Sequence, residues 1–209
     1  MNSFGSKAHA RIAQFGVDNQ KRLHDLIRDT VWLERRRINT EVKTGTVTDA
    51  DQLEAMRDDL VMLGEMNNTA DQLAFVGLYS LVELRVKALL KDHIVALVTS
   101  NAITSRDAKQ VYRIDVLKQV LRDHLRIDLP LVNHYAAIDE IRLINNSVKH
   151  NGVVSADLAG YPGWRRGRPL RGLPRAFNRL SPQVAPFFED LAKKTPNLRP
   201  RTRTNPTLP

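Results

Sequence analysis

Apolar residues recur every three to four positions through most of the first 150 residues, and this spacing constrains the fold more than any other feature of the chain. Such a period places apolar side chains on one face of an α-helix, whereas a half-buried strand requires strict alternation. No stretch of useful length alternates apolar and polar residues. The sequence therefore predicts an all-α fold, an antiparallel bundle of about five helices without a sheet.

Residues that favour turns or helix ends separate the predicted helices. A turn-forming segment at 43–49 follows the first long amphipathic helix. Asn67 and Asn68 are predicted to end the second helix, and Thr69 with Gln72 resembles a capping box that starts the third. The third helix carries apolar residues on nearly every side, as a helix at the centre of a bundle does. The predicted helices span residues 7–41, 50–66, 69–94, 106–126 and 131–150.

Proline and positive charge concentrate at the C-terminal end of the chain. From Tyr161 onward there are 11 Lys or Arg against 2 Asp or Glu, and nine of the ten prolines lie there. The first 160 residues hold 21 charges of each sign, so the net charge of +9 comes from the tail. A coincident change of composition and charge marks a boundary. We predict a helical domain at 1–152 and a basic Pro/Gly-rich extension at 153–209, irregular except for a short helix at 182–194, with 195–209 disordered.

Several functional classes are excluded by composition. The chain has no cysteine, and therefore no disulfide, thiolate nucleophile or Cys-ligated zinc site. The N-terminus lacks a secretory signal pattern, and the most apolar stretch, 73–84, is shorter than the roughly 20 residues that a bilayer requires. We predict a cytoplasmic protein with no membrane segment, metal or cofactor. Five histidines are interpreted as structural or surface residues: His9, His24, His93, His124 and His134.

The last predicted helix ends in a polar stripe. On a helical wheel with about 100° per residue, one face carries Arg142, Asn145, Asn146, Lys149 and His150. Such a face can simply be solvated. Adjacent asparagines are poor helix formers, however, so solvation alone does not explain their presence here. His150 lies in the last turn, where the helix dipole favours its protonated form and a histidine can exchange a proton near neutral pH. The stripe is therefore a candidate site.

The segment from Ile141 to Gly152 resembles the signature that ends the final core helix of HEPN domains, all-helical proteins that include many metal-independent ribonucleases. The family pattern is an arginine, a polar residue, about three variable residues and a histidine. Asn146 and His150 match the polar residue and the histidine. The family arginine falls on Asn145, and Arg142, one turn earlier on the same face, is the nearest arginine. The similarity covers roughly residues 70–152, including 79–83, which resembles the first long core helix.

The resemblance implies a homodimer that cleaves RNA without a metal. His150 would act as acid and base on the ribose 2′-hydroxyl, Arg142 would supply a cation to the phosphate, and Asn146 would orient the substrate. Asn145 and Lys149 would contact it. Such activity commonly belongs to toxins or phage defence, restrained by an antitoxin or a nucleotidyltransferase-like partner. The residues leave open a non-catalytic helical module that binds a protein partner or nucleic acid.

Two arginine-rich segments are candidate phosphate contacts. Residues 164–171 combine Trp164 with four arginines in a predicted flexible setting, and Arg165, Arg166 and Arg168 are predicted to hold the RNA backbone beside His150. Alternatively this charge run is solvated, or residues 166–169 form an AT-hook-like core that enters an A/T minor groove. Residues 35–37 are three consecutive arginines, interpreted as capping charges or as a phosphate-contacting patch.

Overall fold

The computed structural model describes residues 3–111 and 113–196, and within these ranges it contains helices and one isolated β-bridge but no strand. The predicted all-α class is confirmed. Among the described residues, no helix is long and apolar enough to cross a membrane. In the described part of the chain, three 3-10 turns lie between the helices, at Leu129–Leu131, Leu158–Gly160 and Ser181–Gln183. The helices are α1 (Ser3–Thr44), α2 (Ala50–Thr99), α3 (Ser105–Gln110), α4 (Ile114–Leu125), α5 (Tyr135–His150), α6 (Leu173–Leu180) and α7 (Val184–Lys194).

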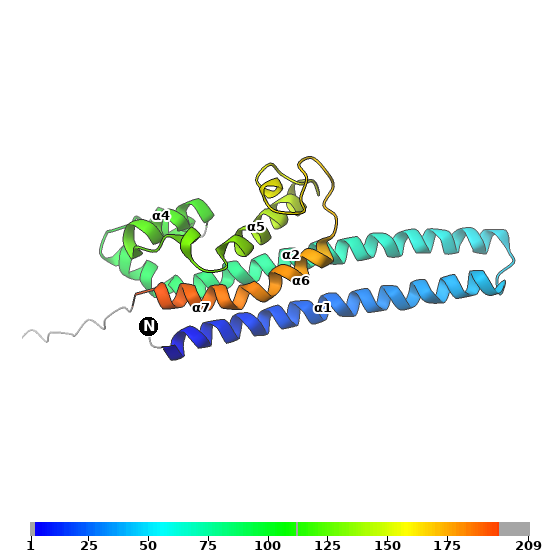
Figure 1. The fold of residues 1–209 in the computed structure, drawn as a ribbon, viewed down its shortest axis with the longest axis horizontal. Helices are drawn as coiled ribbons and strands as arrows, with labels where there is room; N and C mark the ends of the chain where they lie inside the picture. The colour runs from blue at the N-terminus through cyan, green and yellow to red at the C-terminus, as the bar shows by residue number, and fades with distance from the viewer. Residues whose placement is uncertain (1–2, 112, 197–209) are drawn as a thin grey trace, which may run out of the picture.

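Helices α1 and α2 form a long antiparallel hairpin that sets the shape of the molecule (Figure 1). At 1.5 Å per residue, the 50 residues of α2 extend about 75 Å. The predicted helix break at Asn67 and Asn68 is wrong, because α2 continues through both residues. Each asparagine costs less than about 1 kcal/mol of helix propensity. Packing between the two helices, which buries Val31 and Ile38 of α1 and Ala70 of α2, outweighs that cost.

Glycines bring α1 and α2 close together where the other helices pack. A Cβ atom added at Gly16 would lie 2.6 Å from Cδ1 of Leu81, and one added at Gly77 would lie 2.5 Å from the side-chain nitrogen Nε2 of Gln20. Both distances are too short for a Cβ atom, so a larger residue at either position would force its neighbour to move. Figure 1 shows that α4 to α7 cover one half of the hairpin, while its other half projects beyond them. The hairpin therefore has a covered inner half and an exposed outer half.

One hydrophobic core fills the covered half. It includes Phe75 and Leu78 of α2 and Ile141 and Ile144 of α5, none of them more than marginally exposed. Residues after Gly152 belong to the same cluster, and they come from the Pro/Gly-rich segment, α6 and α7. These are Val154, Leu158, Leu170, Leu173, Ala176, Phe177, Leu180, Val184, Ala185, Phe187, Phe188, Leu191 and Ala192. The segment after residue 152 thus completes the core that α2 and α5 begin.

Two predicted helices have different bounds in the structure. The predicted helix at 106–126 is divided into α3 and α4. Thr104 and Asp107 form a capping box that starts α3, and the chain turns after it at Val111, which is fully buried. The predicted helix at 131–150 begins only at Tyr135, because His134 adopts a left-handed conformation with φ of 64°.

The prediction of irregular structure up to residue 181 is wrong for α6. Prolines and glycines in this segment were expected to prevent a helix. Pro174, however, lies in the first turn of α6, where backbone N–H groups have no acceptor within the helix, so the N–H that proline lacks costs no hydrogen bond. Leu173, Phe177 and Leu180 then recur at helical spacing and are buried. Of the segment predicted to be disordered, only Thr195 and Pro196 lie within the described residues, and Thr195 is buried.

Candidate functional site

Asp139 on α5 organises the side chains around the predicted polar stripe. Nε and Nη2 of Arg142 donate to one carboxylate oxygen of Asp139 at 3.0 and 2.9 Å, and the Tyr135 hydroxyl donates to the same oxygen at 3.2 Å. The Tyr161 hydroxyl donates to the other oxygen at 2.9 Å. Burial alone would lower the pKa of Arg142, but the hydrogen bond and charge of Asp139 raise it. Arg142 is therefore charged, and a neighbouring carboxylate holds it in place.

Because of the tyrosines around Asp139, we expect the free energy of unfolding to fall at alkaline pH. Burial, followed by the charge of Glu83, raises the pKa of Tyr79 to about 12. Burial and Asp139 also raise the pKa of Tyr135 and of Tyr161. Above pH of about 10 the unfolded chain loses these protons while the folded chain keeps them, so the free energy of unfolding falls as the pH rises. Urea unfolding at pH 9, 10 and 11 measures this fall.

Tyr135→Phe and Tyr161→Phe remove two of these three titrating groups and serve as the comparison for the alkaline experiment. Each should flatten the loss of stability between pH 10 and 11 relative to the parent protein. If the double variant loses stability as steeply as the parent, Tyr135 and Tyr161 are not the source of the alkaline sensitivity.

Glu140, the next residue on α5, fastens the Pro/Gly-rich segment to this helix. Its side chain is 3% exposed and accepts hydrogen bonds from the Trp164 indole nitrogen at 2.6 Å and from Arg179 at 2.6 and 2.9 Å. The hydrogen bond to Glu140 raises the pKa of Arg179. Trp164 also packs against the hydrophobic core. The predicted flexible setting of Trp164 is therefore wrong, since both its ring and its N–H are held.

The arginine segment 165–168 lies beside the end of α5. The Leu170 amide donates to the Gly152 carbonyl at 2.7 Å, and the Val154 amide donates to the Arg168 carbonyl at 2.9 Å. These bonds pair the chain just after His150 with the chain that carries Arg168. Four side chains at this end of the molecule are exposed: those of His150, Arg165, Arg166 and Arg168.

A groove of about 620 Å³ runs along α5 between α2, α3 and the start of α4, and we call it the α5 groove. Five of its lining residues are Lys or Arg and two are acidic, so it favours anions. Lys109, Arg113 and Lys149 form no ion pair with any described residue. The lining residues from α5 are Arg142, Asn145, Asn146 and Lys149. The others are Tyr79, Glu83, Lys87, Lys109, Gln110, Arg113, Ile114 and Asp115.

Four of the five residues predicted from the stripe thus meet in the α5 groove, and His150 does not line it. His150 is exposed at the last position of α5, one turn beyond the half-buried Asn146. Asn145 is only 1% exposed, and its side-chain oxygen has no hydrogen-bond partner among the described residues. An arginine at such a buried position would lose its hydration, which is costly unless a carboxylate compensates it. Arg142 is the only α5 arginine that lines the groove.

Lys87, Lys109 and Arg113 were not predicted as site residues. They lie on α2, on α3 and just before α4, so they reach the groove only through the packing of these elements against α5. No local spacing relates them to the polar stripe. Within the two described ranges, no group of three or more His, Asp or Glu side chains is arranged to hold a metal ion.

The candidate functional site comprises the α5 groove and the exposed His150 at the end of the same helix. Comparison of the chain with models of protein families, with curated proteins and with solved structures gave no match.

Proposed function

We propose that this chain is an HEPN-like, RNA-directed protein that acts as a dimeric, metal-independent endoribonuclease of the toxin or defence type. The observation that carries the proposal is the α5 groove, in which cations from α2, α3 and α5 gather beside a helix that ends in an exposed histidine. Clustered Lys and Arg side chains of this kind suit the phosphates of a nucleic-acid backbone. Arg165, Arg166 and Arg168 extend the positive charge beyond His150.

In the proposed reaction, the ribose 2′-oxygen attacks the adjacent phosphorus while His150 accepts the 2′-hydroxyl proton. The bond from phosphorus to the 5′-oxygen breaks, and this oxygen receives a proton, which leaves a 2′,3′-cyclic phosphate and a 5′-hydroxyl. Arg142 and Lys149 offset the charge that builds on the phosphate, and Asn146 orients it. Only RNA offers the 2′-hydroxyl.

A dimer supplies the second proton-transfer group that this reaction uses. One chain presents a single histidine at the end of α5. If two copies meet at these ends, one His150 accepts the 2′-hydroxyl proton and the other donates a proton to the leaving 5′-oxygen. An antitoxin-like or nucleotidyltransferase-like partner would restrain the activity by covering the same surface.

Cleavage in the presence of EDTA tests the proposal. The protein should cut single-stranded RNA under chelation and leave 2′,3′-cyclic phosphate ends, and His150→Ala should reduce the rate at least about 100-fold. The matched control is His124→Ala, since His124 is also exposed in the last turn of its helix, α4, but lies outside the α5 groove. Absence of cleavage by the parent protein under all conditions, or equal loss in both variants, contradicts the catalytic proposal.

A second candidate function is RNA or protein binding without catalysis. The ion pair between Arg142 and Asp139 and the position of His150 outside the groove favour it. In that case RNA binds without being cut, and His150→Ala leaves the affinity unchanged. Arg113→Gln and Lys149→Gln, which remove groove cations, should weaken binding under both candidate functions, so only the cleavage assay separates them.

A further inference from the structure

The exposed outer half of the hairpin carries a second positively charged groove, of about 550 Å³, which we call the α1 groove. It shares no lining residue with the α5 groove. Its cations come from α1, and no carboxylate lines it. The lining residues are Arg28, Trp32, Arg35, Arg36, Asn39, Thr40 and Lys43 of α1 and Asn67 of α2.

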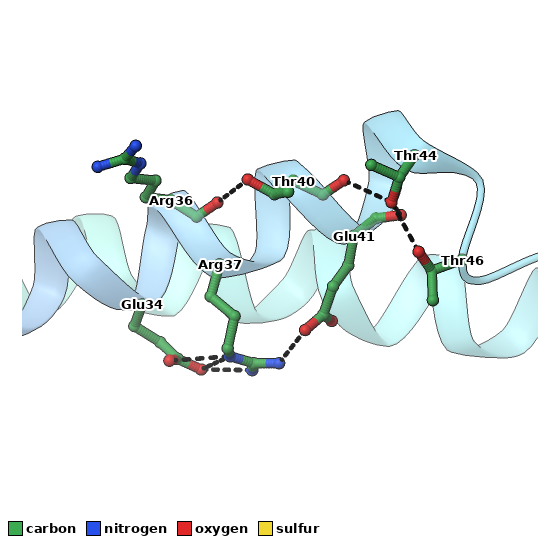
Figure 2. A network of polar contacts seen from close by, with 7 residues as sticks. All are labelled: Glu34, Arg36, Arg37, Thr40, Glu41, Thr44 and Thr46. Carbon is green, nitrogen blue, oxygen red and sulfur yellow. Dashed lines mark hydrogen bonds and ion pairs between the residues drawn. The ribbon is translucent and has the colours of Figure 1, made fainter.

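The four cations of the α1 groove are exposed, and none forms an ion pair with a described residue. They contrast with Arg37 on the same helix, whose guanidinium bonds to Glu34 and, at 2.7 Å, to Glu41. Figure 2 shows Arg37 enclosed between these two carboxylates, while the side chain of Arg36 points away from them. The carboxylates of α1 therefore neutralise Arg37 and leave the cations of the groove available.

An exposed aromatic ring lies among these cations. Trp32 is 55% exposed, and Cζ of Arg36 lies 5.3 Å from the centre of its ring. Arg28, Trp32 and Lys43 follow one another on one face of α1 over about 22 Å, the length of roughly six stacked nucleotides. Aromatic rings between cations bind single-stranded nucleic acids, because an unpaired base stacks on the ring while the cations hold phosphates.

Capping of the helix dipole does not explain this arrangement. The dipole attracts cations only within the last turn of a helix, and α1 ends at Thr44. Lys43 lies within that turn, whereas Arg28 and Arg35 lie two or more turns before it. The helix dipole therefore does not account for the position of these two arginines.

We propose that the α1 groove binds the phosphate backbone of single-stranded nucleic acid, with one unpaired base stacked on Trp32. The inference rests on the proposed RNA-directed function for its choice of RNA as the probe. It adds a binding surface on the outer half of the hairpin to the α5 groove on the inner half.

Fluorescence anisotropy with a labelled 12-nucleotide single-stranded RNA tests this proposal, with every variant made in the His150→Ala background so that cleavage cannot alter the probe. Arg28→Gln/Arg35→Gln and Arg36→Gln/Lys43→Gln should each lower the affinity about tenfold or more. The slope of log affinity against log salt should fall by about 1.4 in each, at about 0.7 per lost phosphate contact. The matched control is Arg37→Gln, which removes one charge from the same helix and should leave the affinity almost unchanged.

The stacking contact is tested separately. Trp32→Ala should lower the affinity for the single strand at least about fivefold. It should not change the affinity for a duplex of the same sequence, whose bases are paired. The control is Leu33→Ala, because Leu33 is similarly exposed, at 59%, is the next residue of α1 and does not line the groove.

Two results would overturn the proposal: an equal loss of affinity in Arg37→Gln, or unchanged affinity in the groove variants. In the second case, light scattering shows whether the groove variants also convert a dimer into a monomer. Such a conversion would assign the groove to a second copy of the chain. Groove-dependent binding without any cleavage by the unmodified protein leaves this inference standing and contradicts only the catalytic proposal. Cleavage by the unmodified protein combined with unaltered binding in the groove variants contradicts only this inference.

Discussion

Phe177→Ala should lower the free energy of unfolding by about 3–5 kcal/mol, the loss expected when a fully buried phenylalanine is removed. Phe177 is 1% exposed on α6. Its ring lies edge-on to the ring of Phe75 of α2, with 5.7 Å between the ring centroids, and the centroid of the His24 ring of α1 lies 5.4 Å away. Alanine would leave a cavity where three helices meet. Urea unfolding followed by circular dichroism at 222 nm measures the loss.

Phe15→Ala is the matched control for this substitution. Phe15 is also a helical phenylalanine but is 65% exposed, so its replacement should change the stability by no more than about 0.5 kcal/mol. If Phe177→Ala is as mild as Phe15→Ala, or melts α6 without shifting the main transition, the extension predicted at 153–209 folds separately from the helical domain. A single transition that shifts as a whole shows that both parts unfold together.

Glu140→Gln should lower the free energy of unfolding by about 2–3 kcal/mol. The substitution keeps the size of the side chain but removes the charge that accepts hydrogen bonds from Trp164 and Arg179. Hydrogen bonds to a buried charge contribute about 1.5–3 kcal/mol each. The expected loss lies below their sum, because Arg179 is 51% exposed and regains water when the bond is lost.

The same substitution has a local readout in the fluorescence of Trp164. In a Trp32→Phe background, acrylamide should quench Trp164 more strongly after Glu140→Gln, because the segment that carries it is released from α5. Glu189→Gln is the control, since Glu189 forms an ion pair with Lys193 one turn away on α7. It should leave both the unfolding transition and the quenching nearly unchanged. Equal behaviour of the two variants would show that Glu140 does not fasten the segment.

The fastening of this segment matters for the candidate site. Glu140 binds Trp164, which immediately precedes the exposed arginines at 165–168. The backbone pairing of Val154 with Arg168 places those arginines beside the end of α5. A variant that releases Trp164 should therefore also displace these arginines from His150. If the proposed function is correct, loss of this buried carboxylate should therefore weaken RNA binding as well as stability.

Local patterns alone determined the helical class and several helix ends. The start of α2 at Ala50 and the end of α5 at His150 agree with the prediction, and the latter is marked by Asn151 and Gly152, which has a φ of 68°. The polar face that carries Arg142, Asn146 and Lys149 also follows from helical spacing. These features depend on residues a few positions apart, whose preferences a sequence states directly.

Only the tertiary structure decided the continuity of α2, the existence of α6 and the composition of the α5 groove. An asparagine within a helix costs less than about 1 kcal/mol, and a proline in the first turn of a helix costs little, because its missing N–H has no partner there. Burial of a side chain such as Phe177 contributes about 3–5 kcal/mol to the free energy of unfolding. The burial of Asn145, the pairing of Arg142 with Asp139 and the arrival of Arg113 beside α5 depend on packing between segments. No spacing along the chain encodes which helices will meet, and the contacts between them override the weaker local signals.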